Sequence, residues 1–352
     1  MKLPLKKNLK FVLLGWGQHL CYMVEKMLER GFLPPVIITH PRCNHQRDKI
    51  FLGKFDLYQD VFELAEAHSL KIIEEESINN QVVIGRLLKL GVNAAFSLSC
   101  RNIIKSEFIN AFDRRIFNLH PTYLPDGRGE GFSWKIMNGI NEVAATLHFL
   151  DEGIDSGDII IQNKKPLSVK YPYPVDFMRQ TQELYEKLID QFLDMLEKNE
   201  EIRSFSQNND ESTHFSRLYT EINGAIDWSW SDEDIERFIR AFSYPYPGSF
   251  SFIDDQKIHI LKAHLLPSDM SCHSYAVGKI KTVLDNGSIK VVLKKHTLVI
   301  EEVSVNGQIL EAAKACKVRQ RFFTPYEVLA KAKLHIPKVK DMNCVLRLSS
   351  KS

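Results

Sequence analysis

The sequence of 352 residues lacks long apolar runs and paired cysteines, and each absence excludes a class of protein. The apolar run FVLL at 11–14 is too short for the core of a secretory leader, and no segment approaches the roughly 20 apolar residues of a membrane span. The six cysteines include no C-x-x-C pair, which fits thiols in a reducing compartment rather than a disulfide framework. We therefore expect a cytoplasmic protein with no membrane partner.

A strong charge of one sign is also missing. Lysine and arginine number 46 against 44 aspartates and glutamates, and the formal net charge of +2 gives no global electrostatic reason to expect nucleic-acid binding. Apolar residues make up 44% of the chain and charged residues 26%, as in an ordinary globular protein. The length suggests two domains.

Three familiar motifs are incomplete. The stretch GWGQHL at 15–20 has the first two glycines of a dinucleotide fingerprint, but Leu20 stands at the third, which disfavours NAD. No G-x-S-x-G elbow is present, so a covalent acyl-enzyme is not indicated. The run HPRCNH at 40–45 brings two histidines and a cysteine together without a fourth ligand nearby, and we expect no metal.

The first half of the chain alternates apolar strands with amphipathic helices, which predicts a parallel sheet with helices on both faces. The predicted strands lie at 11–15, 36–39, 71–73, 92–98 and 115–119, and later at 144–150 and 158–162. The predicted helices lie at 19–30, 58–68, 81–90, 132–138 and 175–198, with a polar loop after residue 39. In such sheets, ligands bind beyond the carboxyl ends of the strands.

The second half has a different pattern. The polar run SFSQNNDEST at 204–213 is predicted to be a linker. A helix capped at Ser231 and several short strands with tight turns follow, which predicts a small β-barrel. We expect domains at 1–205 and 206–335 and a flexible tail at 336–352.

The stretch FNLHPTYLPDGRGEG at 117–131 combines polar side chains with two prolines and three glycines, which is typical of an ordered functional loop. Asn118 and His120 alternate on the end of a strand, so they share one face. The glycine-broken turn LDEGIDSGDI at 150–159 adds three carboxylates, Asp151, Asp155 and Asp158. A histidine base, an amide donor and a carboxylate form a working set for direct acyl transfer.

The paired motifs N-L-H-P-T-Y-L-P-x-x-R-G and D-E-G-I-D-S-G-D-I resemble those of the folate-dependent formyltransferases, and the block AIDWSW…IERFIRAFSYPYPGSFSF at 225–252 resembles the start of their second domain. The resemblance implies a Rossmann-like α/β domain with a mostly parallel sheet, followed by an oligonucleotide-fold-like β-barrel. It also implies a catalytic trio of Asn118, His120 and Asp155, and 10-formyltetrahydrofolate as co-substrate. The implied folate-binding residues are Phe96, Ser97, Leu98, Ser99, Leu150, Asp151 and Asp155.

The acceptor is indicated by details of the loop. The chain lacks the basic loop of the methionyl-tRNA formyltransferases, and it places Asp126 and Glu130 where tRNA phosphates would be unwelcome. The run P-T-Y-L-P-D-G-R-G followed by a tryptophan resembles the sugar-nucleotide N-formyltransferases, which implies a nucleotide-linked amino sugar held by Arg128, Tyr123 and Trp134. Methionyl-tRNA formyltransferase and a folate-binding protein without turnover stay open as alternatives. Sheet edges and surface aromatics are compatible with a homodimer.

Overall fold

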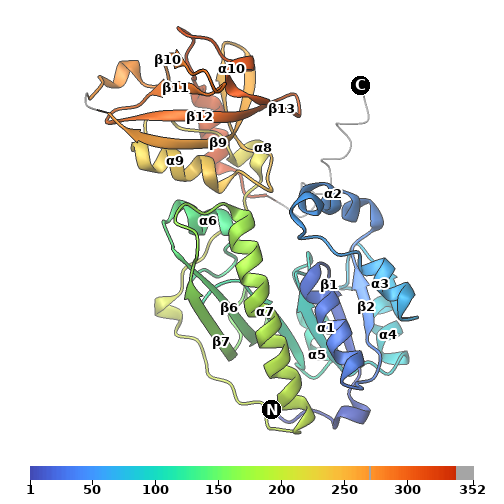
Figure 1. Ribbon diagram of the computed structural model, residues 1–352. Coiled ribbons are helices and arrows are strands. Elements are labelled where there is room, and N and C mark those ends of the chain that lie inside the picture. Colours follow the sequence, from blue (N-terminus) through green and yellow to red (C-terminus); the bar gives the residue numbers. More distant parts are fainter. Residues whose placement is uncertain (269–270, 338–352) are drawn as a thin grey trace.

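Seven strands form one sheet in a computed structural model that describes residues 1–268 and 271–337 (Figure 1). The strands are β1 (Phe11–Gly15), β2 (Val36–Thr39), β3 (Lys71–Glu74), β4 (Ala94–Leu98), β5 (Ile116–His120), β6 (Glu142–Phe149) and β7 (Ile159–Pro166). Across the sheet they follow the order β3-β2-β1-β4-β5-β6-β7, parallel from β3 to β5 and antiparallel beyond. The prediction of a mostly parallel α/β sheet is confirmed.

Helices cover both faces of this sheet because its central strands are apolar on both sides. The helices are α1 (Gln18–Glu29), α2 (Arg42–Leu52), α3 (Val61–Ala67), α4 (Gln81–Lys89), α5 (Ser106–Ala111), α6 (Phe132–Met137) and α7 (Pro174–Glu197). Leu13 of β1 belongs to the buried cluster that includes α1 and α7, and its neighbours Val12 and Leu14 belong to the cluster on the α4 and α5 side. Phe192 of α7 packs against the rings of Phe96 and Phe117, with centroids 5.4 and 4.8 Å apart.

A second, antiparallel sheet forms in the C-terminal part of the chain. Its strands are β8 (Ser249–Ile253), β9 (Gln256–Pro267), β10 (Ile280–Val283), β11 (Ile289–Val292), β12 (His296–Val305) and β13 (Gln308–Glu311), with α8 (Thr220–Asn223), α9 (Asp232–Ala241), α10 (Ala312–Ala315) and α11 (Tyr326–Leu334) around them. The Ser231 side chain caps α9 by accepting the N–H of Asp234.

The two edges of this sheet meet the same short segment. Phe323 exchanges two backbone hydrogen bonds with Phe252 of β8, at 3.0 and 2.8 Å. Two residues earlier, Arg321 bridges to Lys279, directly before β10. One segment therefore bridges both edge strands, in agreement with the predicted small barrel.

The two sheets are joined through α6 and α9, which pack against each other (Figure 1). Ser133 of α6 donates to the carbonyl oxygen of Ala241 at 2.7 Å. Arg240 of α9 donates to the carbonyl oxygen of Pro172 at 2.8 Å, just before α7. The C-terminal sheet is thus fixed to the end of the N-terminal sheet that carries α6.

The polar loop expected after residue 39 is wrong: α2 and a short 3-10 helix (Gly53–Phe55) occupy this stretch. The buried residues of α2 are Asn44, His45 and Asp48, so this helix presents a polar face to the protein and lacks the apolar stripe on which a sequence-based assignment depends. The short elements α5, β13 and α11 were not anticipated either.

Two other expectations concern membrane-spanning segments and the end of the chain. Within the part that the structure describes, no helix combines the length and apolarity needed to cross a membrane. The expected flexible tail at 336–352 lies outside the described residues from position 338 onward.

Candidate active site

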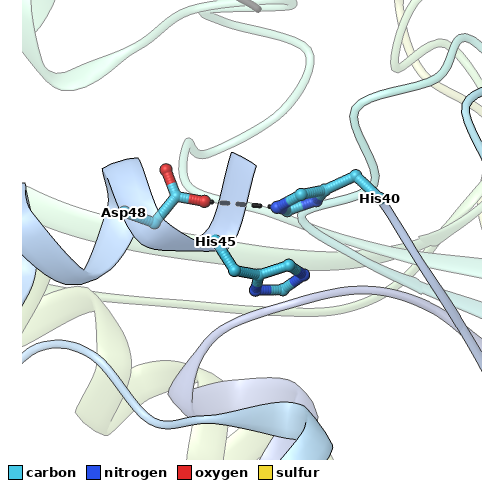
Figure 2. A group of neighbouring side chains, drawn as sticks. All are labelled: His40, His45 and Asp48. Carbon is cyan, nitrogen blue, oxygen red and sulfur yellow. Dashed lines mark ion pairs between the residues drawn. The ribbon is translucent and has the colours of Figure 1, made fainter. Parts of the chain in front are cut away.

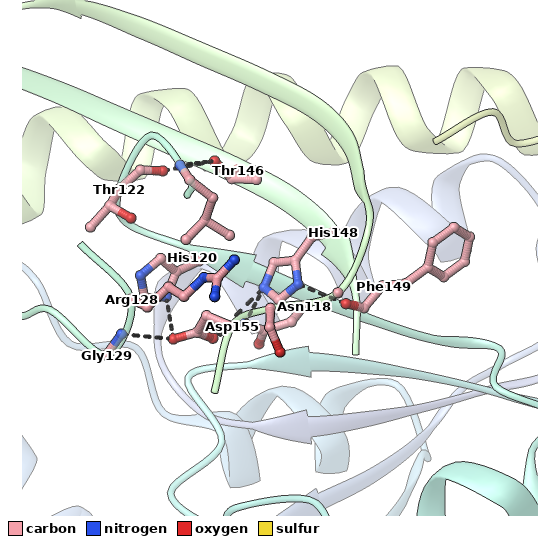
Figure 3. A network of polar contacts seen from close by, with 12 residues as sticks. Asn118, His120, Thr122, Arg128, Gly129, Thr146, His148, Phe149 and Asp155 are labelled. Carbon is pink, nitrogen blue, oxygen red and sulfur yellow. Dashed lines mark hydrogen bonds and ion pairs between the residues drawn. The ribbon is translucent and has the colours of Figure 1, made fainter. Parts of the chain in front are cut away.

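The loop motif and the later aspartate motif meet in space (Figure 3). Asn118 and His120 lie two residues apart on β5, so their side chains leave the same face of the sheet. Asp155, in the turn between β6 and β7, faces both: its Oδ2 lies 3.2 Å from Nδ1 of His120, and its Oδ1 lies 3.4 Å from Nδ2 of Asn118. The structure thus brings the three predicted catalytic residues together.

The carboxylate of Asp155 is held by the neighbouring loop as well. Its Oδ2 accepts the backbone N–H of Gly129 at 3.0 Å, and only 15% of the side chain is exposed. Burial favours a higher pKa, but the facing His120 ring and the Gly129 N–H favour the charged form and hold the pKa of Asp155 below its ordinary value. An ionised carboxylate therefore faces His120 at neutral pH.

Both ring nitrogens of His120 face acceptors. Nδ1 meets the Asp155 carboxylate, and Nε2 lies 3.0 Å from the carbonyl oxygen of Gly127. Only a ring with hydrogens on both nitrogens can donate to both oxygens, because a neutral ring has one donor and one acceptor. To take a proton at Nε2, His120 must first release the Gly127 carbonyl.

His148 lies on β6, paired with Asn118 in the sheet, and was not anticipated from the sequence. Its Nδ1 lies 2.7 Å from the carbonyl oxygen of Phe149, so Nδ1 carries the hydrogen and Nε2 is left to accept from Nδ2 of Asn118 at 3.0 Å. Burial lowers the pKa of His148 to about 4, so the ring is neutral at neutral pH. His148 therefore fixes which end of the Asn118 amide points toward Asp155.

Thr146 is a second unanticipated residue, and it holds the loop after β5. Its hydroxyl donates to the carbonyl oxygen of Thr122 at 2.7 Å and accepts the N–H of Leu124 at 3.3 Å. Thr146 and His148 are polar residues at alternating positions of a strand that is apolar except for Glu142 at its start, which places both on one face. That alternation was the sequence pattern that could have identified them.

The predicted substrate contacts occupy three different surroundings. Arg128 is only 4% exposed, and its guanidinium donates to Oε1 of Gln207 at 3.1 and 2.8 Å and to Oδ1 of Asn209 at 3.0 Å. Trp134 is half-buried and donates from Nε1 to the carbonyl oxygen of Ser216 at 2.8 Å. Tyr123 is 42% exposed. Of the three, Tyr123 is the most exposed, and the Nε and one terminal nitrogen of the Arg128 guanidinium are engaged by Gln207 and Asn209.

The predicted folate-binding residues divide between two segments. Phe96 and Leu98 are fully buried in β4, where only their backbone can contact a ligand. Ser97 lies opposite Asn118 in the sheet, and Ser99 follows β4 with a positive φ of 61°. In the other segment, Leu150 donates its N–H to Ile116, and Asp151 is bound within its own turn by Gly153 and Ser156.

A separate group of side chains tests the expectation that no metal is bound (Figure 2). His40, His45 and Asp48 place possible ligand atoms within 4.8 Å of one another. The two imidazole rings, however, stack 3.9 Å apart at an angle of 14°, so their lone pairs lie in nearly parallel planes. Both oxygens of Asp48 accept from Arg101, at 2.8 and 2.6 Å. This group does not offer the convergent set of ligands that a metal requires.

Two family descriptions match the chain. Residues 42–190 match "Formyl transferase", and residues 219–320 match "Formyl transferase, C-terminal domain". Among curated proteins, the bifunctional polymyxin resistance protein ArnA of Wigglesworthia glossinidia brevipalpis is 30% identical over 282 residues, which are 78% of this chain and 39% of that protein. This chain thus spans well under half the length of that relative.

Solved structures show the same fold at low identity. WlaRD, described as a sugar 3N-formyl transferase in the presence of dTDP and 5-N-formyl-THF, is 22% identical with a TM-score of 0.60, over 83% of this chain and 97% of its own. An N-formyltransferase from Helicobacter canadensis in complex with folinic acid and dTDP-3-aminofucose is 22% identical with a TM-score of 0.60. The match covers 83% of this chain and 98% of that one.

Proposed function

This chain belongs to the formyl transferase family, and from that premise we propose that it transfers a formyl group from 10-formyltetrahydrofolate to the primary amine of a nucleotide-linked amino-deoxysugar. Two structural neighbours support this choice of substrates, since each is described with a folate and with dTDP or a dTDP-linked amino sugar. The single observation that carries the proposal is the convergence of Asn118, His120 and Asp155.

The histidine acts as the base in this proposal. The folate supplies an activated formyl carbon, and the neutral amine attacks it while a carbon–nitrogen bond to the folate breaks. The amine loses a proton, and Nε2 of His120 takes it once this nitrogen no longer contacts the carbonyl oxygen of Gly127. His120 can then donate the proton to the departing nitrogen of the folate. Asp155 stabilises the resulting imidazolium through Nδ1.

Asn118 supplies the donor for the oxygen of the formyl group. One N–H of its amide is bound to Nε2 of His148 at 3.0 Å, and the other faces Asp155 at the longer distance of 3.4 Å. The longer contact is the weaker one, so this second N–H is available for a developing oxyanion. His148 keeps the amide in the orientation that such donation needs.

For the two substrates, the proposal follows the resemblance in the sequence. The pteridine ring lies against the backbone at the end of β4, near Ser97 and Ser99, and beside the Asp155 turn. The position of Ser97 opposite Asn118 supports this placement, because it brings the end of β4 next to the trio. The sugar nucleotide lies on the side of the exposed Tyr123.

The experiment is a screen of nucleotide-linked amino sugars with 10-formyltetrahydrofolate, read by mass spectrometry. A mass gain of one formyl group on one of the sugars, absent with Asp155→Asn, supports the proposal. Methionyl-tRNA is included as an acceptor in the same screen. Formylation of methionyl-tRNA alone assigns the chain to the alternative enzyme, and folate binding without turnover of any amine refutes the proposed activity.

A further inference from the structure

The segment between the two sheets lies along both loops that carry the trio. We call residues 205–216 the strap. At one end, Phe205 exchanges two backbone hydrogen bonds with Ile159, at 2.9 and 3.0 Å, at the start of β7. At the other, the backbone of Arg128 donates to the carbonyl oxygen of Thr213 at 2.9 Å and accepts the N–H of Phe215 at 3.0 Å. The strap is therefore part of the site and not a free linker.

Gln207 is the residue of the strap that connects the two loops by its side chain. Its Oε1 accepts two hydrogen bonds from the guanidinium of Arg128, at 3.1 and 2.8 Å. Its Nε2 donates to the carbonyl oxygens of Asp155 and Gly157, at 2.9 and 2.7 Å. A guanidinium only donates and a carbonyl only accepts, so the amide has one possible orientation and all of its positions are used.

The contacts of Gln207 act on a residue in an uncommon backbone conformation. Asp155 has a φ of 50°, in the left-handed region that residues other than glycine rarely adopt. Gln207 holds the carbonyl oxygen of Asp155 from one side, while the N–H of Gly129 holds its carboxylate from the other. The backbone and the side chain of Asp155 are thus fixed by two neighbouring segments.

We propose that Gln207 is a positioning residue of the active site, whose amide fixes the Asp155 turn against the Arg128 loop and so sets how the Asp155 carboxylate meets His120. This inference deepens the proposed function, and the expected effect of Gln207 on turnover rests on that function. The expected effect of Gln207 on the geometry of the Asp155 turn is independent of the proposed function. A glutamine that only filled the polar surroundings of Arg128 would need its oxygen alone, whereas positioning Asp155 requires its two N–H groups.

Two full-chain variants separate these roles. Gln207→Glu keeps an acceptor for Arg128 but places carboxylate oxygens against the carbonyls of Asp155 and Gly157. Gln207→Met keeps the length of the side chain and removes all four hydrogen bonds. Gln308→Met is the matched control, because it makes the same exchange at an exposed glutamine of β13, in the C-terminal sheet.

In steady-state kinetics, both Gln207 variants should lower kcat about tenfold to a hundredfold, since a misplacement of about 1 Å costs up to about 10²-fold. KM for both substrates should change by less than about threefold, since Gln207 is not proposed to contact either substrate. Gln308→Met should match the wild type. A kcat of Gln207→Glu equal to that of the wild type overturns the inference, because the donors of Gln207 would then be unnecessary.

Hydrogen exchange gives a readout that needs no substrate. The amide of Gly129 donates to Asp155, so its exchange reports directly on the carboxylate contact. In Gln207→Met, this amide should exchange faster, and in Gln308→Met it should not. Faster exchange confined to residues 205–216, with Gly129 protected, overturns the inference. An inactive wild type would refute the proposed function while leaving this measurement intact.

Discussion

Nε2 of His120 lies 3.0 Å from the carbonyl oxygen of Gly127, so the nitrogen that is proposed to take the proton of the amine is bound to the backbone of its own loop. The loop therefore orients the His120 ring in this structure, and the contact between Nε2 and the Gly127 carbonyl must break before the proposed proton transfer. Its conformation depends on Gly127, which has a φ of 71°.

Gly127→Ala should lower kcat and destabilise the protein. A Cβ here would lie 2.3 Å from Oε2 of Glu130 and 2.9 Å from Cγ2 of Thr122, at a positive φ, which costs on the order of 1–3 kcal/mol. Urea denaturation and steady-state kinetics measure both effects. Gly131→Ala is the control in the same loop, because no atom lies within 4 Å of its Cβ and φ is −107°. Equal effects of the two substitutions would contradict this account of the loop.

Substitution of the trio should affect turnover more than binding. His120→Asn, Asn118→Ala and Asp155→Asn are each expected to lower kcat far more than they raise KM, and loss of an oxyanion donor costs about 10²–10³-fold in comparable enzymes. The triple variant should lose little more than the most damaging single variant, since the three residues act as one unit.

The measurement is steady-state kinetics with folding checked by circular dichroism, and His68→Asn, at an exposed position, serves as the control. A folded His120→Asn protein with near-normal kcat would remove His120 from the proposed mechanism.

Glu130 should make the stability of the wild type depend on pH. The side chain is 6% exposed, and among the described residues its Oε1 has no hydrogen-bond partner. Burial raises the pKa of Glu130 from 4.5 to about 7, so the folded state favours the protonated form. The stability that the fold gains with Glu130 protonated is fully present below the pKa of Glu130 in the unfolded chain. It is lost as the pH rises through 4.5 toward 7.

Glu130→Gln cannot ionise, so it should gain stability relative to the wild type between pH 5 and pH 8, by about 2 kcal/mol. Urea denaturation of both proteins at the two pH values measures the change. Glu107→Gln, at the exposed start of α5, is the matched control. The same difference in free energy of unfolding at both pH values would show that Glu130 is not held protonated by the fold.

Removal of metal ions should leave the proposed activity unchanged. The trio can move the proton and stabilise the oxyanion without a Lewis acid, and the Asp48 carboxylate in the His40 and His45 group is occupied by Arg101. The test compares formyl transfer before and after incubation with a chelator. Activity that is lost on chelation and restored by zinc would contradict the prediction.

The strand periodicity of β5 was sufficient to predict that Asn118 and His120 share a face, because alternation is a local property of the sequence. The partner that the strap contributes could not be predicted in this way. Gln207 lies 52 residues from Asp155 and 79 from Arg128, inside a run whose polar composition is typical of a solvated linker. The polar buried face of α2 was missed for a related reason: its hydrogen-bonded histidine and aspartate do not follow the apolar pattern that identifies a helix.

The strap also limits how far the two parts of this chain can be treated as interchangeable modules. Consider a chimera that joins the N-terminal sheet to a different C-terminal unit at the start of the strap, before Gln207. It would replace the side-chain partners of Arg128 and of the Asp155 turn together with that unit. A junction placed between residue 217 and the start of α8 keeps those partners with the sheet they support. The suitable boundary for recombination therefore lies after the strap, whereas the composition of the sequence predicts a boundary before it, at 205/206.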